Sequence, residues 1–328
     1  MKRRLLLGFV AIAALPAHST VLKVATIAPE GSVWHRALAT IADDWKRISS
    51  GAIEVRIYPG GVAGDDEAMV AKMRIGQLSG AALTADGMAS IATEMRIFQT
   101  PMLIDDDAEL DHLRARLGPE LESLARAQGF EIVAWCDVGW IYLFSKAPIA
   151  DPDAARGNRI QVSPGDTGWA TALTSAGYKP LVLPTTEILT GLQSGMIDAF
   201  AVPPVVALSS QWFGVAKHMM DLKWSPMLGA VVVSEQAWQQ LPADETAALQ
   251  ASARRATAAA QAEVRRFEHD AIVAMQSHGL TVHEVSADDT RRFEDEIRAS
   301  YAKLVGASVP APIFKEANEV LDEYRRAH

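Results

Sequence analysis

The sequence predicts an α/β fold of two lobes, with two β/α domains and a long helix that spans both of them. Segments 21–27, 53–58 and 79–84 have the pattern of strands separated by helices, and a second β/α series covers residues 159–202. The range 243–278 contains no helix breaker. With 328 residues, 49% hydrophobic and 22% charged, the chain is long enough to give each lobe its own core.

The first series begins with the apolar strand 21–27, after which Ser32 can cap a helix. Residues 53–58 alternate as a half-buried strand, and a loop rich in Gly and Asp separates them from a helix that ends at Gly76. The β-α-β-α-β order predicts a parallel sheet with covering helices.

A long acidic helix over 107–128 leads into two apolar runs, 130–136 and 140–144. The second series then follows, with strands 159–163, 179–183 and 197–202 and helices 167–176 and 186–193. We expect lobes with these limits: lobe I over 20–138 with about 225–260, lobe II over 139–224 with about 261–310, and a C-terminal helix over 311–328.

The spanning helix, over about 243–278, is predicted from its lack of breakers and from one apolar stripe in its second half. The stripe consists of Val264, Phe267, Ala271 and Met275. A helix of this length would extend about 54 Å, which is longer than one small domain. Two shorter helices with a bend remain the alternative.

The N-terminus has the pattern of a cleavable secretory signal. Lys2, Arg3 and Arg4 precede the apolar run 5–15, which is shorter than the roughly 20 residues that span a bilayer. Small residues precede a cut after Ser19. We therefore expect residues 1–19 to be removed and the mature protein to be soluble and exported to the periplasm. A buried first helix would not explain the three cations.

Charge and composition exclude several classes of partner. Lys and Arg total 31 against 40 Asp and Glu, so the formal charge is −9, and removal of the three N-terminal cations gives −9 − 3 = −12. Such an acidic chain has no general attraction for nucleic acid or for anionic membrane surfaces. Beyond Ser19 no apolar run is long enough for a membrane helix, so we expect no direct membrane insertion.

Motifs for metal or catalytic chemistry are missing from the sequence. The eight histidines form no close pair and no HExxH spacing, and the acidic runs 65–67 and 105–107 lack the ligand spacing of a calcium loop. Cys136 lies in an apolar run and is predicted to be a buried strand thiol rather than a nucleophile. No nucleophile elbow, phosphate loop or dinucleotide fingerprint is present. We expect no metal, no cofactor and no catalysis.

Four sequence blocks together resemble one known family. They are Leu22–Thr26 with Pro29–His35, Ser50–Gly60 with Gly64–Glu67, Ala155–Val162, and Glu187 with Leu192–Asp198. Their order and spacing resemble the substrate-binding proteins of tripartite ATP-independent periplasmic (TRAP) transporters, the DctP family. The resemblance implies a periplasmic-binding-protein fold, a ligand cleft between the lobes, and delivery of a small solute to TRAP permease membrane subunits.

The chain departs from the family pattern at three polar positions. Gln161 stands where the family usually carries an Arg that clamps the ligand's carboxylate, and Ile141 and Val202 stand where two further polar anchors are common. An anionic carboxylate buried without a cation costs several kcal/mol. We therefore predict a subtype that lacks the carboxylate clamp. Arg159 lies two positions from Gln161 on the same strand face and could substitute for it.

Aromatic residues cluster near the predicted cleft and favour a largely apolar cavity, suited to a lipid-like, isoprenoid or aromatic solute. Glu67 keeps an acidic position of the family and either orients a ligand hydroxyl or amine, or serves as a helix N-terminal carboxylate. The candidate ligand-binding residues are Trp34, Glu67, Trp140, Tyr142, Gln161, Trp169, Val202, Trp212 and Phe213.

These patterns predict an exported solute-binding protein whose lobes close around an apolar or amphipathic ligand by hinge motion, with binding and not catalysis as its function. Three alternatives stay open at this point. They are the same role with an organic acid held by Arg159, a periplasmic ligand sensor without transport, and a secreted hydrolase with a dispersed site.

Overall fold

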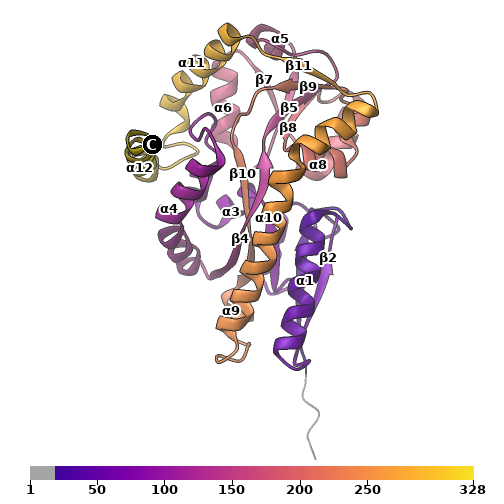
Figure 1. Ribbon diagram of the computed structural model, residues 1–328, viewed down its shortest axis with the longest axis vertical. Helices are drawn as coiled ribbons and strands as arrows, with labels where there is room; N and C mark the ends of the chain where they lie inside the picture. The colour runs from indigo at the N-terminus through magenta and orange to yellow at the C-terminus, as the bar shows by residue number, and fades with distance from the viewer. Residues whose placement is uncertain (1–18) are drawn as a thin grey trace, which may run out of the picture.

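The computed structural model describes residues 19–328, and the predicted signal at 1–19 lies, except for Ser19, outside the described residues. Two sheets carry the fold, and helices cover their faces (Figure 1). The predicted α/β class is confirmed. We call the part built on the five-stranded sheet lobe I and the part built on the six-stranded sheet lobe II.

The lobe I sheet has the order β2-β1-β3-β10-β4. As predicted, β1 pairs in parallel with β2 and β3. The prediction of a parallel sheet does not hold for the whole sheet, because β10 enters between β3 and β4 and is antiparallel to both. The strands are β1 (Thr20–Thr26), β2 (Ile53–Tyr58), β3 (Gly80–Leu83), β4 (Phe130–Trp140) and β10 (Pro226–Ser234).

The lobe II sheet has the order β11-β9-β5-β8-β6-β7. The second β/α series supplies β6, β7 and β8, with β6 parallel to both of the others. In contrast, β5 runs antiparallel to β8 and β9. The strands are β5 (Tyr142–Ser145), β6 (Arg159–Val162), β7 (Lys179–Val182), β8 (Ala199–Val202), β9 (His218–Asp221) and β11 (Thr281–Glu284).

Helices begin where the sequence supplies caps. Ser32 accepts a hydrogen bond from the backbone N–H of His35, and Asp106 accepts one from that of Glu109. The helices are α1 (Val33–Ile48), α2 (Asp66–Arg74), α3 (Ala85–Ile91), α4 (Asp107–Ala127), α5 (Pro152–Arg156), α6 (Thr167–Ser175), α7 (Ile188–Ser194), α8 (Pro204–Ser209), α9 (Glu235–Trp238), α10 (Thr246–Ser277), α11 (Ala287–Leu304) and α12 (Ala311–Ala327). Three 3-10 helices are η1 (Thr93–Gln99), η2 (Thr185–Glu187) and η3 (Trp212–Gly214).

The predicted long helix is present as α10, which is continuous over 32 residues and therefore about 48 Å long. It runs from beside α1 and β4 of lobe I to α8 of lobe II (Figure 1). Val264, Ala271 and Met275 of the predicted stripe are buried, but Phe267 is 41% exposed. Phe267 lies about 60° around the helix from Val264, at the rim of the stripe, and the guanidinium of Arg266 covers its ring.

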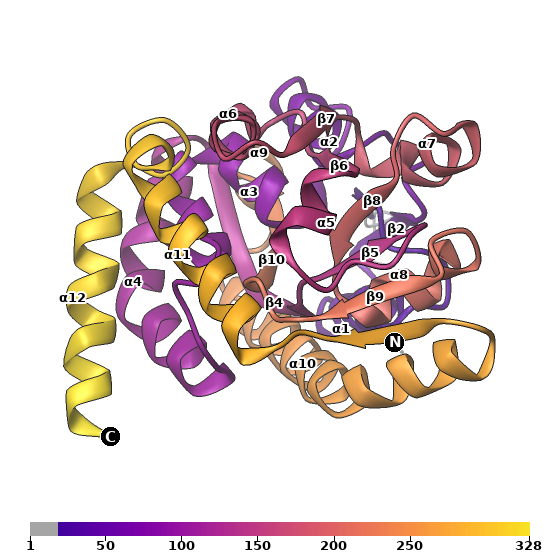
Figure 2. The same ribbon diagram turned by 90° about the horizontal axis from the view of Figure 1, so that it is seen from above.

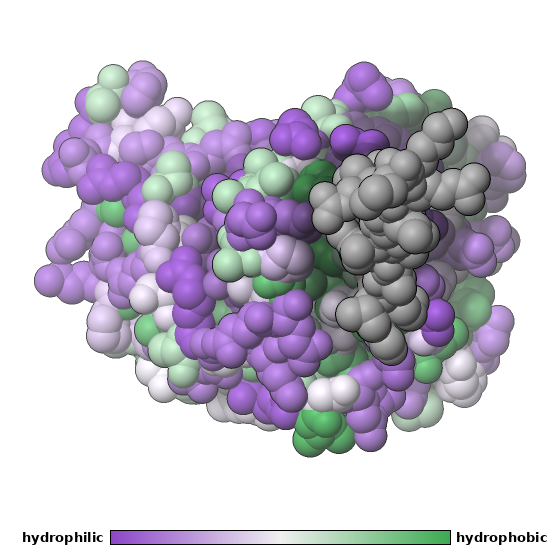
Figure 3. Space-filling view, turned by 90° about the horizontal axis from the view of Figure 1, so that it is seen from below, coloured by the Kyte–Doolittle hydropathy of each residue, from purple (hydrophilic) through white to green (hydrophobic). Residues whose placement is uncertain are grey.

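The C-terminal helix packs beside α4 at the edge of the molecule (Figure 2). Near its end, Arg325 donates to Glu109 at 2.6 Å and to Asp105 at 3.0 Å. The face seen from below is mainly hydrophilic where it is uncovered, with scattered hydrophobic side chains (Figure 3). Within residues 19–328, no helix is both long and apolar enough to cross a membrane.

Besides α10, two adjacent segments of the chain cross between the lobes. Ile141 joins β4 to β5, and residues 222–225 join β9 to β10. The segments hydrogen-bond each other, from the N–H of Ile141 to the carbonyl of Ser225 at 2.9 Å and from the N–H of Trp224 to the carbonyl of Ile141 at 3.0 Å. Glu268 of α10 accepts from the N–H of Trp140 at 3.2 Å, and thereby fixes the helix to the crossing.

Four charged residues, which we call the α10 cluster, join α10 to α4 and β4. They are Asp111, Arg114, Asp137 and Arg265. Arg265 donates to Asp111 at 2.8 Å and to Asp137 at 2.6 Å. The guanidinium of Arg265 lowers the pKa of Asp111, whereas burial raises the pKa of Asp137. With Asp107, whose carboxylate lies 3.6 Å from Nε of Arg265, three carboxylates thus meet two guanidinium groups.

Candidate ligand-binding cleft

A cavity of about 530 Å³ lies between the two lobes and takes its lining from both. Thr26 and Leu83 line it from the ends of β1 and β3, and Val162 and Val202 from the ends of β6 and β8. The cavity therefore lies at the carboxyl ends of strands in both sheets, where α/β folds collect ligands. Ile141 and Trp224 line it at the two interlobe crossings.

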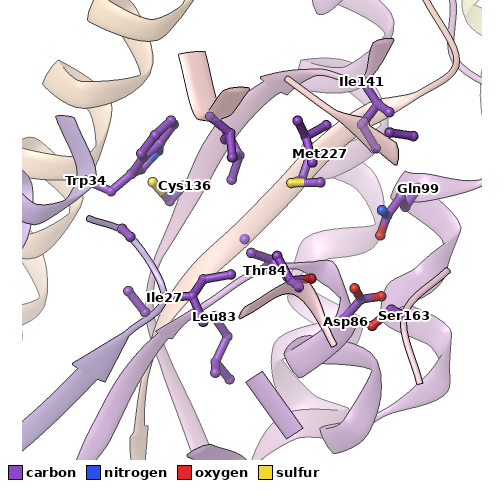
Figure 4. A pocket seen from close by; sticks show the side chains of 18 of the residues that line it. Ile27, Trp34, Leu83, Thr84, Asp86, Gln99, Cys136, Ile141, Ser163 and Met227 are labelled. Carbon is purple, nitrogen blue, oxygen red and sulfur yellow. The ribbon is translucent and has the colours of Figure 1, made fainter. Parts of the chain in front are cut away.

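One side of the cavity is apolar. Trp34, Cys136, Ile27 and Leu83 lie together there (Figure 4). The indole N–H of Trp34 donates to the carbonyl of Asp137 at 3.0 Å, so its polar atom is satisfied away from a ligand. Burial raises the pKa of the Cys136 thiol to about 12, which keeps it protonated and unreactive at neutral pH.

Five of the nine predicted site residues line this cavity: Trp34, Gln161, Trp169, Val202 and Trp212. Trp34 comes from lobe I and the other four from lobe II. Trp212 packs edge-on against the buried Phe200, with ring centroids 5.4 Å apart. The aromatic pattern therefore located much of the apolar wall.

The other four predicted residues, Glu67, Trp140, Tyr142 and Phe213, are not among the lining residues. Trp140 and Tyr142 flank Ile141, which does line the cavity, and alternation along an extended chain directs its two neighbours the other way. The indole N–H of Trp140 donates to Asp107 at 2.9 Å, and the hydroxyl of Tyr142 donates to Glu268 at 3.1 Å. Phe213 packs against the core. The aromatic pattern could not separate these core positions from the lining.

Gln161 and Arg159 share a strand but have different surroundings. Gln161 is buried at the cavity wall, and its amide donates to the carbonyl of Leu183 at 2.7 Å. Arg159 begins β6, has a side chain 46% exposed and lies outside the lining. It makes a bidentate pair with Asp198, at 2.7 and 2.8 Å. Arg159 therefore does not supply the missing cation to the cavity in this conformation.

The opposite side of the cavity is polar. Asp86, Gln99, Ser163 and Thr84 lie there (Figure 4). Arg96 is the only Arg or Lys among the described lining residues. Its location in η1 puts it on lobe I, and it is 5% exposed.

Arg96 bridges the two lobes. It pairs with Asp86 of its own lobe at 3.2 Å and with Asp166 of lobe II at 3.1 Å, and it donates to the carbonyl of Gly165 at 2.7 Å. A Cβ at position 165 would lie 2.2 Å from Oε1 of Glu67 and 3.1 Å from Nη2 of Arg96, so any larger residue there would displace these side chains. We call these contacts the interlobe clasp.

Carboxylates outnumber cations around the clasp. Asp66 accepts from the N–H and hydroxyl of Thr84, at 3.1 and 2.8 Å. Burial raises the pKa of Asp66 to about 7, and burial is also the main cause that raises the pKa of Glu67 and of Asp86. We call this set the cleft cluster: Asp66, Glu67, Asp86, Arg96 and Asp166.

The sequence interpretation missed Arg96, Asp86 and Asp166. A signal existed for the two aspartates, since each follows the carboxyl end of a strand, β3 or β6. Arg96 gave none, because it lies in a short 3-10 helix and its partner Asp166 is 70 positions away. The expectation that the histidines form no close pair does not hold in the folded chain. The strands β9 and β11 place Nδ1 of His218 2.9 Å from Nε2 of His283. Within residues 19–328, no group of three or more His, Cys, Asp or Glu could hold a metal ion.

Residues 24–307 match the family described as "Bacterial extracellular solute-binding protein, family 7", DctP. The 2,3-diketo-L-gulonate-binding periplasmic protein YiaO of Escherichia coli is 25% identical over 87% of this chain and 88% of its own. The C4-dicarboxylate-binding periplasmic protein DctP of Rhodobacter capsulatus is 24% identical over 82% of both chains. The structure is also similar to the sugar acid binding protein DctPAm of Advenella mimigardefordensis in complex with galactonate, with a TM-score of 0.87, 18% identity, and coverage of 93% of this chain and 98% of the other.

Proposed function

The chain belongs to the DctP family of solute-binding proteins, and from that premise we propose that it captures a small apolar or amphipathic ligand without a carboxylate. The ligand binds in the interlobe cavity of about 530 Å³. The protein then delivers it from the periplasm to the membrane subunits of a TRAP permease. Its role is binding and not catalysis.

The observation that carries the ligand class is the lack of a free cation in the cavity lining. Among the described lining residues, Arg96 is the only Arg or Lys, and it already contacts the carboxylates of Asp86 and Asp166 and the carbonyl of Gly165. A carboxylate entering this cavity would lose its hydration without gaining a cation, at a cost of several kcal/mol. That cost would abolish micromolar binding.

The proposal separates this chain from the relatives whose names state an acidic ligand. Those names include a C4-dicarboxylate and galactonate. In this chain, Gln161 lines the cavity where the family pattern has a clamping Arg, and its amide is engaged by the carbonyl of Leu183. Ile141 and Val202 line the cavity at the other two positions. These neutral side chains support a subtype without the carboxylate clamp.

Native mass spectrometry of the exported protein, followed by extraction of the carried small molecule, tests the ligand class. We expect a neutral or amine-bearing compound with a substantial apolar part. Recovery of a small dicarboxylate or a sugar acid would contradict the proposal. The same measurement checks the signal, because an intact mass that still includes residues 1–19 would contradict its removal.

Variants of the cavity wall test how the recovered compound is held. Trp169→Ala and Trp212→Ala each remove aromatic packing and should weaken its binding by a hundredfold or more in calorimetric titration. Gln161→Ala removes at most one ordinary hydrogen bond and should weaken binding by about tenfold or less. A thousandfold loss at Gln161→Ala, with both Trp variants unaffected, would instead identify a polar clamp.

The transport role is tested separately from the ligand class. We expect genes for a large and a small permease subunit beside the gene of this protein, and uptake of the recovered compound to require all three products. A protein that binds the compound but leaves its uptake unchanged on deletion would be a periplasmic sensor.

A further inference from the structure

The guanidinium of Arg96 is already paired within the protein. Its guanidinium contacts Asp86 at 3.2 Å and Asp166 at 3.1 Å, and it donates to the carbonyl of Gly165 at 2.7 Å. With a side chain 6% exposed, it is held in place from both lobes. Because Asp86 and Asp166 come from different lobes, both of its counterions are present only when the lobes are together.

The surroundings of Arg96 carry surplus negative charge. The cleft cluster contains four carboxylates and one guanidinium, so the formal sum is −4 + 1 = −3 when all are ionised. The negative charge of Asp86 contributes to the raised pKa of both Asp66 and Glu67, and that of Asp166 contributes to the raised pKa of Asp86. The carboxylates therefore already repel one another before any ligand binds.

This surplus faces one side of the cavity only. Asp86 lies beside Ser163 at the polar side, whereas Trp34, Cys136 and Ile27 lie at the other (Figure 4). An amphipathic ligand would leave its polar group unsatisfied against the indole and thiol side. Its polar group is therefore expected beside Asp86, within the field of the cleft cluster.

We propose that Asp86 and Asp166 determine specificity by rejecting anions: they neutralise Arg96 and restrict the cavity to ligands whose polar group is neutral or cationic. The inference rests on the proposed function and names its ligand class more closely. It also assigns the two aspartates a role distinct from that of Gln161. Even if a carboxylate reached the polar side, the two resident carboxylates would compete with it for the same guanidinium.

Three probes of equal chain length test whether the cavity rejects anions: 1-octanol, octylamine and octanoate. Binding is followed by calorimetry and by tryptophan fluorescence, since Trp34, Trp169, Trp212 and Trp224 line the cavity. The wild type should bind 1-octanol and octylamine at least tenfold more tightly than octanoate. Equal binding of octanoate and 1-octanol would overturn the inference while leaving an apolar cavity in place.

The double variant Asp86→Asn/Asp166→Asn should release the charge of Arg96 to the cavity. Octanoate should then bind at least tenfold more tightly than to the wild type, and octylamine should bind more weakly. Adding Arg96→Gln to the double variant should abolish the gain for octanoate. An unchanged preference in the double variant would overturn the inference. If that variant fails to fold, Asp166→Asn alone must shift the preference in the same direction.

Asp198→Asn is the matched control, because it also frees an arginine from its carboxylate but does so outside the cavity lining, at Arg159. It should leave all three affinities within twofold of the wild type. A gain for octanoate in this control would show that Arg159 supplies the cation, and would overturn the inference. If none of the three probes binds the wild type, the proposed function itself fails.

Discussion

Two clusters of charged residues hold this molecule together, and they differ in their balance of charge. The α10 cluster, together with Asp107, has three carboxylates and two guanidinium groups where α10 meets α4 and β4. The cleft cluster has four carboxylates and the single guanidinium of Arg96. The first fixes elements that stay in contact, and the second joins two lobes across a cavity. The charge is therefore nearly balanced at the structural junction and strongly negative at the binding site.

Arg265→Met removes one of the two guanidinium groups of the α10 cluster and should give the largest loss of stability. It leaves Asp111 and the nearly buried Asp137 with Arg114 as their only remaining guanidinium. Breaking a buried pair from one side typically costs several kcal/mol, and we expect about 3 kcal/mol in the free energy of unfolding. Chemical denaturation measures it, with Arg266→Met, the exposed neighbour, expected within about 0.5 kcal/mol of wild type. Equal losses in the two variants would contradict a special role for the α10 cluster.

Asp66→Asn tests the cleft cluster through its pH dependence. The pKa of Asp66 is raised from 3.8 to about 7, so its contribution to stability is complete below 3.8 and is lost as the pH rises through about 7. Between pH 5 and pH 8 the wild type should therefore lose about 2.7 kcal/mol relative to the variant. Denaturation at both pH values measures this difference.

Asp151→Asn is the control for that measurement, because Asn preserves the cap that Asp151 provides to α5, outside the cleft cluster. It should leave the difference in stability between pH 5 and pH 8 as in the wild type. If Asp66→Asn behaves in the same way as this control, the raised pKa of Asp66 is wrong.

Gly165→Ala tests whether the clasp acts on closure rather than on folding. The added Cβ would meet Glu67 and Arg96 across the lobe boundary, so these side chains must shift and the clasp contacts should weaken. We expect 1-octanol to bind about tenfold more weakly, which is about 1.4 kcal/mol, with the unfolding midpoint of the free protein nearly unchanged. Gly214→Ala has no atom within 4 Å of its new Cβ and should alter neither quantity. A large fall in the unfolding midpoint for Gly165→Ala would show that the clasp contributes to folding stability rather than to closure.

Arg159→Ala should have the smallest effect. Its partner Asp198 is on the same sheet, and the pair is partly exposed, so its loss should change the stability little. Because Arg159 lies outside the cavity lining, octanoate and 1-octanol should bind as they do to the wild type. A selective loss of octanoate binding, measured by calorimetry, would support the alternative in which Arg159 holds an organic acid.

The sequence was sufficient for local elements, because these depend on patterns within one segment. The cap at Ser32 and the unbroken run that became α10 are of this kind. The direction of β10 was not predictable in this way, since a run of apolar residues is equally compatible with parallel and antiparallel pairing. The clasp depends on contacts between residues 10 and 69–70 positions apart, and no local pattern records them.

The single cysteine has a consequence for experiments on motion. Cys136 lines the cavity, and burial keeps its thiol protonated. Because Cys136 is half-buried in the cavity lining, a bulky thiol reagent should react faster when the lobes part, so the rate of alkylation reports that opening. Since the chain contains no second cysteine, every modified molecule carries the label at one known atom. The alkylation rate of Cys136 therefore measures the opening of the cavity, and a bound solute should lower that rate.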